Sequence, residues 1–144
     1  MGRKRKNHSK VYEFDDFSIS IDIYKKQVLF FQMSFFGWKD NDNKEEQDIT
    51  EAKKEIKKAL RNSFKDIKAE RRIYDLIMGE ISKGKQMSVK LFFAFYIKNQ
   101  DEISNIENEI LEHSKELMEE IKTILNKNSF VKFTKPQRKE RYEK

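Results

Sequence analysis

The alternation of apolar and polar residues over residues 17–24 predicts a β-strand. The segment reads FSISIDIY, with an apolar residue at every second position, which is the pattern of a half-buried strand. A short polar turn at 25–27 leads into the aromatic-rich run 28–38, so we expect the two segments to form a hairpin. Gly37 is expected to end the second strand, and the polar segment 40–47 is expected to be a solvated loop.

The apolar spacing changes to that of a helix after Asp48, which is a suitable N-cap. The apolar residues between Ile49 and Ile67 fall on one stripe when they are placed at the helical period. This spacing predicts an amphipathic helix that starts at Ile49.

The following segment, 72–82, fits two kinds of element. Its apolar residues nearly continue the stripe of the preceding helix, which favours a helix that extends to about Ser82, with or without a break at 68–71. The competing interpretation is a strand, but Asp75 and Gly79 would interrupt one face of that strand. A helix is therefore predicted here.

Three more elements are predicted in the second half of the chain. Every odd position from Met87 to Ile97 is apolar, which indicates a strand. A helical stripe then runs from Ile103 to about Asn126. At about 1.5 Å per residue this last helix is about 40 Å long, so its far end is expected either to project or to pair with another chain. Residues 130–134 are expected to add a short edge strand.

These patterns define an α+β fold with the element order β-β-α-β-α. We expect a three- to four-stranded, mainly antiparallel sheet with two long amphipathic helices on one face. The predicted domain covers residues 11–135, between a basic N-terminal tail (1–10) and a basic C-terminal tail (136–144).

Composition excludes several classes of protein. The 144 residues contain no Cys, which excludes a disulfide scaffold, a thiolate zinc site and a cysteine nucleophile. The chain lacks a run of about 18 apolar residues, the length that a membrane span needs, and its basic start lacks the apolar stretch of a secretory signal. We therefore expect a cytoplasmic protein with no membrane partner.

The formal net charge of +6 is concentrated at the two ends of the chain. Residues 1–10 contain five basic and no acidic residues, and residues 130–144 contain six basic and two acidic ones. The central residues 11–129 contain 20 basic against 23 acidic residues. Binding to a polyanion is therefore expected of the tails more than of the folded body.

Catalytic motifs are scarce. The sequence has no glycine-rich phosphate loop and no nucleophile elbow, and His8 and His113 stand far apart. Acidic clusters lie at 13–22 and 40–48; a magnesium-dependent nuclease would use such carboxylates, but they have no diagnostic spacing. We predict a non-enzymatic protein with no catalytic residue, no cofactor and no metal site.

The sheet face opposite the predicted core contains aromatic residues among small polar ones. Its candidate binding residues are Phe30, Phe36, Trp38, Lys90, Phe92 and Tyr96. Such a face fits a platform for single-stranded nucleic acid, where bases stack on rings and cations follow the phosphates. It also fits an interface with another protein subunit, or a second layer of the same core covered by the termini or by a helix.

Basic residues supply the remaining candidates for nucleic-acid contacts. In the tails these are Arg3, Lys4, Arg5, Lys6, Arg138, Lys139 and Arg141. The surface of the first helix adds a basic ridge with Lys53, Lys57 and Arg61, and Arg71 and Arg72 follow it. The tails, the ridge and the arginine pair are expected to be able to combine, whereas the last helix is strongly acidic.

Two functions follow from these features. The first is a nucleic-acid-binding protein whose partner is DNA or RNA. The second is a small inhibitor or adaptor, of the kind that phages and mobile elements encode, which docks on a larger protein or ribonucleoprotein. The opposite charges of the two helices also allow a homodimer in which they pair across the interface.

Overall fold

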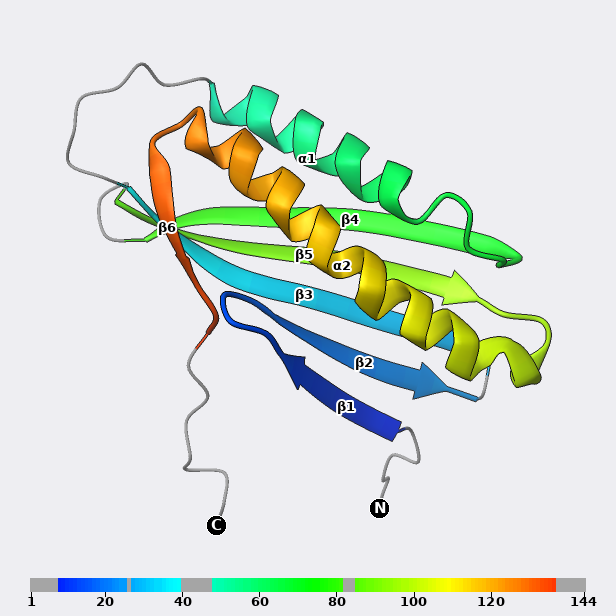
Figure 1. Ribbon diagram of the computed structural model, residues 1–144. Coiled ribbons are helices and arrows are strands. Elements are labelled where there is room, and N and C mark those ends of the chain that lie inside the picture. The colour runs from blue at the N-terminus through cyan, green and yellow to red at the C-terminus, as the bar shows by residue number, and fades with distance from the viewer. Residues whose placement is uncertain (1–7, 26, 40–47, 82–84, 137–144) are drawn as a thin grey trace, which may run out of the picture.

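The computed structural model describes residues 8–25, 27–39, 48–81 and 85–136, and it has an α+β fold built in two layers (Figure 1). Its order is β-β-β-α-β-β-α-β, with a short 3₁₀ turn at Gln100–Glu102 before the second helix. The elements are β1 (His8–Glu13), β2 (Ser18–Tyr24), β3 (Val28–Lys39), α1 (Ile49–Ser63), β4 (Arg71–Ile81), β5 (Gln86–Tyr96), α2 (Ile103–Asn126) and β6 (Phe130–Thr134).

All six strands form one antiparallel sheet with the order β1-β2-β3-β5-β4. Strand β6 pairs with the last residues of β3, from Phe36 to Lys39, beyond the point where β2 stops pairing. The long strands β3 and β5 are therefore the centre of the sheet, and β1 and β4 are its two edges.

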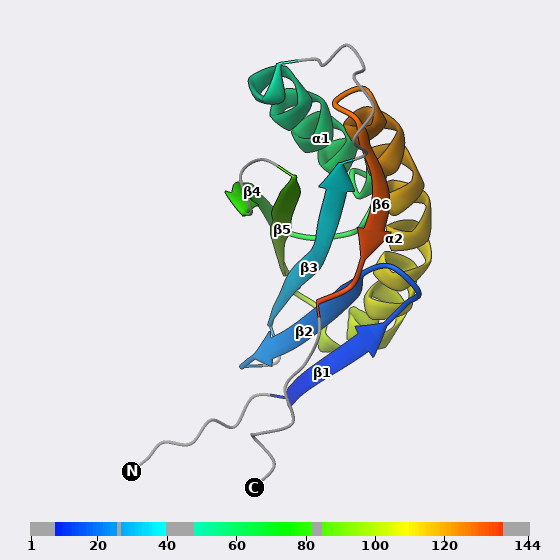
Figure 2. The same cartoon turned by 90° about the vertical axis from the view of Figure 1, so that its left-hand side faces the viewer.

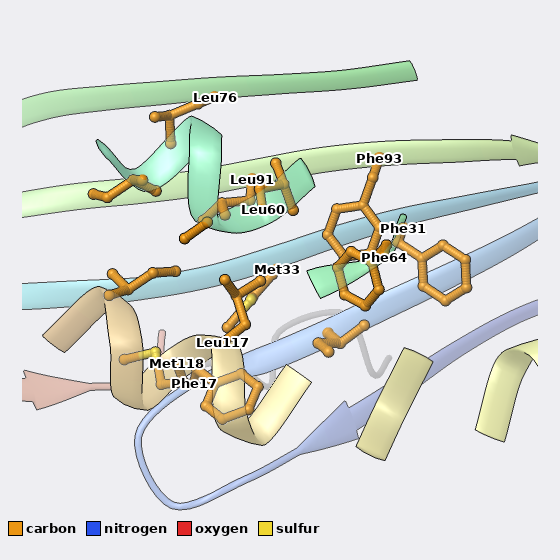
Figure 3. Close-up of a cluster of buried hydrophobic side chains, with 14 of the residues drawn as sticks. Phe17, Phe31, Met33, Leu60, Phe64, Leu76, Leu91, Phe93, Leu117 and Met118 are labelled. Carbon is orange, nitrogen blue, oxygen red and sulfur yellow. The ribbon is translucent and has the colours of Figure 1, made fainter. Parts of the chain in front are cut away.

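Both helices lie on the same face of the sheet (Figure 2). The rings of Phe31 and Phe93 stack at 5.2 Å between neighbouring strands, and Phe64, which follows α1, stacks on Phe93 at 4.8 Å. Leu117 and Met118 of α2 complete the packing over β2 and β3 (Figure 3). Burial of these apolar side chains is the main stabilising contribution to the two-layer arrangement.

The two predicted helices are confirmed, but α2 does not project from the body. Its buried residues run from Ile106 to Leu125, so almost its whole length covers the sheet. The central strands β3 and β5 have 12 and 11 residues, which is about 40 Å at about 3.4 Å per residue, so the sheet is long enough to be covered by a helix of this length. The side chain of Asp48 caps α1 by accepting a hydrogen bond from the Thr50 amide at 3.2 Å.

The predicted helix over 72–82 is wrong, because residues 71–81 form the edge strand β4. Tyr74, Leu76 and Met78 pack on the helix side, whereas Asp75 and Gly79 lie on the opposite, exposed face. An exposed face tolerates polar residues and glycine, so their interruption of the apolar pattern costs little.

The predicted count of three to four strands and the predicted order are also wrong. Strand β1 begins inside the segment assigned to the N-terminal tail. Lys10 is held there by the buried carboxylate of Glu107 on α2: its Nζ lies 3.1 Å from Oε2, and the Tyr12 hydroxyl donates to the same oxygen at 3.3 Å. The hydrogen bond to Glu107 raises the pKa of the Lys10 ammonium.

Gly37 does not end β3, which continues to Lys39. A Cβ at Gly37 would lie 3.4 Å from the Phe130 ring and 3.5 Å from the Phe133 ring. Glycine therefore allows the rings of β6 to approach the backbone of β3 closely.

Candidate functional site

The face of the sheet opposite the helices, called here the open face, presents the predicted aromatic residues. Within the described ranges no helix covers this face (Figure 2), so the interpretation in which a helix buries it is wrong. Tyr96 is 38% exposed, and Phe30, Phe36, Trp38 and Phe92 are half-buried. Coverage by the tails concerns residues 1–7 and 137–144, which lie outside the described residues.

The open face has aromatic rings on both sides of a polar centre. Phe30 and Phe92 lie 6.5 Å apart at one side, measured between ring centroids. Phe36 and Trp38 lie at the other side of the centre, further along β3. With about 3.4 Å per residue, Phe30 and Trp38 are about 27 Å apart along the strand.

The polar centre forms an open cavity of about 330 Å³. It is lined by Val11, Ser18, Ser20, Gln32, Ser34, Phe35, Phe36, Ser88, Lys90 and Pro136. The Gln32 amide donates to the Ser34 hydroxyl at 3.1 Å, and Lys90 is exposed beside Ser34 on the neighbouring strand. The cavity therefore combines one cation with several hydroxyl groups and an aromatic ring, and its lining includes no carboxylate.

A second cavity of about 510 Å³ shares Phe36 and Pro136 with the first. Its lining adds Trp38, Gln86, Thr134 and Lys135. The Trp38 indole donates a hydrogen bond from Nε1 to Oγ1 of Thr134 at 3.1 Å. This bond orients the indole ring, so β6 contributes directly to the shape of the second cavity.

The two ends of the described chain meet the sheet at different places: the C-terminal end, Pro136, lines the first cavity, whereas the N-terminal end, His8, pairs with Ile23, three residues along β1 from the lining residue Val11. Val11 follows the basic N-terminal segment in the sequence, and Pro136 precedes the segment that contains Arg138, Lys139 and Arg141. Val11 and Pro136, which are far apart in the chain, thus line one cavity because β1 and β6 both lie on the β2 side of β3.

Another aromatic group lies near the start of β4. The Arg71 guanidinium lies 5.9 Å from the centroid of the Tyr96 ring, and Tyr24, at the end of β2, is also exposed on this face. Arg71 is therefore the member of the arginine pair that reaches the open face.

The structure divides the other predicted basic residues between places that are far apart. Lys53, Lys57 and Arg61 belong to α1, on the helix side of the sheet. Arg72 also points to that side, and its guanidinium donates to the carbonyl oxygen of Ile67. Arg3, Lys4, Arg5, Lys6, Arg138, Lys139 and Arg141 lie outside the described residues.

Several residues of the cavities were not selected from the sequence. Ser18, Ser20 and Ser34 occupy polar positions of predicted strands, but hydroxyl groups at such positions are common on any solvated sheet face. Val11 and Thr134 contribute because of the pairings of β1 and β6. The pairing of β6 with β3 joins segments far apart in the chain, and β1 pairs with the strand that follows it; periodicity alone indicates neither pairing.

Carboxylates at the turn between β1 and β2 take part in ion pairs. Asp16 pairs with Lys122 of α2, and Glu13 lies 3.1 Å from the Lys135 ammonium. The hydrogen bond to Asp16 raises the pKa of Lys122. In the part of the chain that the structure describes, no three His, Asp or Glu residues are grouped as metal ligands; residues 40–47 of the predicted acidic loop lie outside it.

Comparison of the chain with protein-family models, with curated proteins and with solved structures finds no match. Among the described residues, neither helix combines the length and the apolar character that crossing a bilayer requires.

Proposed function

We propose that this protein binds single-stranded nucleic acid on the open face of its sheet, without catalysing a reaction. The observation that carries the proposal is that the basic C-terminal tail leaves the body at a cavity that contains Lys90 and adjoins Phe36 and Trp38. Cationic segments attract the phosphates, and the rings offer stacking surfaces to unpaired bases.

The composition of the cavities favours a single strand over a duplex. Bases can stack on Phe36 and Trp38 only when they are unpaired. The hydroxyl and amide groups of Ser20, Gln32 and Ser88 are suited to hydrogen bonds with phosphate, sugar or base edges. The rings at both sides of Lys90 would accommodate consecutive nucleotides along the strand direction.

The test uses the fluorescence of Trp38, the sole tryptophan in the sequence. Titration with single-stranded DNA and RNA oligonucleotides is expected to quench this fluorescence, and a matched duplex is expected to bind more weakly. The Phe36→Leu variant keeps an apolar side chain but removes the ring, so it should lose about 1–3 kcal/mol of binding free energy for one stacked base.

Lys90→Gln and Lys57→Gln form a matched pair for this test, because each removes one cation, from the open face and from α1 respectively. Lys90→Gln should weaken binding and lower the salt slope by about 0.7, whereas Lys57→Gln should leave both nearly unchanged. The absence of binding at about 50 mM salt, the lower end of the range in which phosphate contacts are strong, would contradict the proposal. So would an equal loss in both variants.

The second candidate function is docking on a larger protein through the outer surface of α2. That surface exposes Glu112, Glu116, Glu119 and Glu120 in a continuous acidic row. It lies on the opposite side of the molecule from the open face (Figure 2), so the two surfaces would contact different partners. Recovery of a stoichiometric protein partner from the native host, unchanged by nuclease treatment and lost in a Glu116→Lys/Glu120→Lys variant, would favour this function.

A further inference from the structure

Strand β4 is a long edge of the sheet with exposed apolar side chains. It has 11 residues and pairs on one side only, with β5. Ile77 and Ile73 are 55% and 44% exposed, the largest exposed fractions among the large apolar residues that the structure describes. Both lie on the open face of the sheet, as their pairing with Lys90 and Ala94 shows. An edge of this kind offers unpaired backbone groups to another strand.

The opposite edge, β1, differs from β4 in the features that discourage pairing. It has six residues, and Lys10 and Glu13 within it are tied by ion pairs to Glu107 and Lys135. Short edge strands that contain charged residues are a common protection against edge-to-edge association. Strand β4 is almost twice as long as β1, and the charged residue near its centre is Asp75, whose carboxylate accepts a hydrogen bond from the Leu76 amide at 2.8 Å; pairing of two β4 strands would replace this local bond with one between the strands.

We propose that β4 is a homodimer interface, in which the β4 strands of two copies pair antiparallel across a two-fold axis at Ile77. A second copy supplies an edge of matching length, and antiparallel pairing about this axis keeps the open faces of both copies on the same side. The proposal does not depend on nucleic-acid binding, because it rests on the edge strand alone.

This register matches the side chains on both faces of the new pair. Ile77 faces Ile77 of the second copy, which covers the most exposed apolar side chain with an identical one. Leu76 comes opposite Met78 on the helix side. Asp75 comes opposite Gly79, where a Cβ added to the glycine would have nothing within 4 Å, so the carboxylate has room to remain solvated.

The test measures the mass in solution by light scattering or sedimentation over about 1 µM to 1 mM, the concentration range of weak to moderate affinities. The wild-type chain should change from the mass of one chain to that of two within this range. Ile77→Lys should weaken dimerisation at least about tenfold, or about 1.4 kcal/mol, because like charges would meet at the axis. Val131→Lys is the control, since Val131 of β6 is 42% exposed and distant from β4.

A cysteine variant tests the register, because the natural chain has no Cys that could interfere. Paired residues across the axis have a Cα separation of about 4.5–5.5 Å, which a disulfide can bridge. Oxidised Ile77→Cys should therefore form a covalent dimer, and Val131→Cys should not. A single-chain mass at all concentrations, or a dimer that Ile77→Lys leaves intact, would overturn the proposal; capture of a strand from another protein by a monomer would also overturn it.

Discussion

Glu107 links the first strand of the sheet to the second helix. Its carboxylate is buried on α2 and receives hydrogen bonds from Lys10 and Tyr12 of β1. A buried carboxylate is stable only when such partners are present. The same contacts keep β1 on β2, and β1 supplies Val11 to the first cavity. One residue outside the open face thereby helps to shape it.

Replacement of Glu107 by Ala is expected to lower the free energy of unfolding by about 1–3 kcal/mol, the usual loss when a buried hydrogen-bonded charge loses its partner. Urea denaturation followed by circular dichroism measures this change. Glu112→Ala is the control, because Glu112 is exposed on the same helix, and its effect should stay within about 0.5 kcal/mol. Equal stability of the two variants would show that Glu107 does not hold β1.

At the scale of elements, β4 shows how one segment can satisfy two apolar periods. Tyr74 and Met78 are four residues apart, as are Ile73 and Ile77, and this spacing resembles a helical stripe. In the structure the first pair faces the helices and the second pair faces outward. Pairing with β5 decides between the two states, because tertiary context overrides a weak local preference.

Substitution of the two described strand glycines by Val should have opposite effects on stability. Gly79→Val is expected to raise the free energy of unfolding by about 0.5–1 kcal/mol, since a Cβ there has open space and glycine weakens a strand. Gly37→Val is expected to lower it by about 1–3 kcal/mol, because the larger side chain would meet the rings of Phe130 and Phe133. Thermal and urea denaturation at low protein concentration measure both changes; destabilisation by Gly79→Val would contradict the placement of that residue.

At the scale of the whole molecule, the helix side and the open face of the sheet differ in the charges that they carry. The acidic α2 and the basic ridge of α1 share one side of the sheet. The open face has Arg71, Lys90 and Lys132 as cations, with Asp22 and Asp75 on β2 and β4, and Lys135 forms an ion pair with Glu13. The body alone therefore offers little net attraction to a polyanion, and the tails would supply most of that attraction.

Removal of residues 1–7 and 137–144 is expected to weaken oligonucleotide binding strongly at low salt and to flatten its salt dependence. Each lost phosphate contact should reduce the slope of log K against log salt by about 0.7 for a single strand. Stability should stay nearly the same, because the truncation keeps all the described helices and strands. Fluorescence titration over a salt series measures the slope; a slope unchanged by the truncation would contradict the proposed role of the tails.

The sequence by itself determined the two helices, the hairpin of β2 and β3, and the sides of β2, β3 and β5 that face the core. These features depend on local periodicity: the apolar residues of β2, β3 and β5 alternate strictly, and burial of one face follows from that alternation. The aromatic residues of the open face were predicted for the same reason.

Only the tertiary structure decided which segments meet. The pairing of β6 with β3 and the cavity between Val11, Lys90 and Pro136 join residues far apart in the chain, whereas β1 and β4 each pair with the next strand in the sequence, which their own patterns do not indicate. Such contacts leave no periodic trace, because a short strand or an edge strand is stabilised by its neighbours more than by its own pattern. The charge of the tails was visible in the sequence, whereas the place where they join the body was a consequence of the fold.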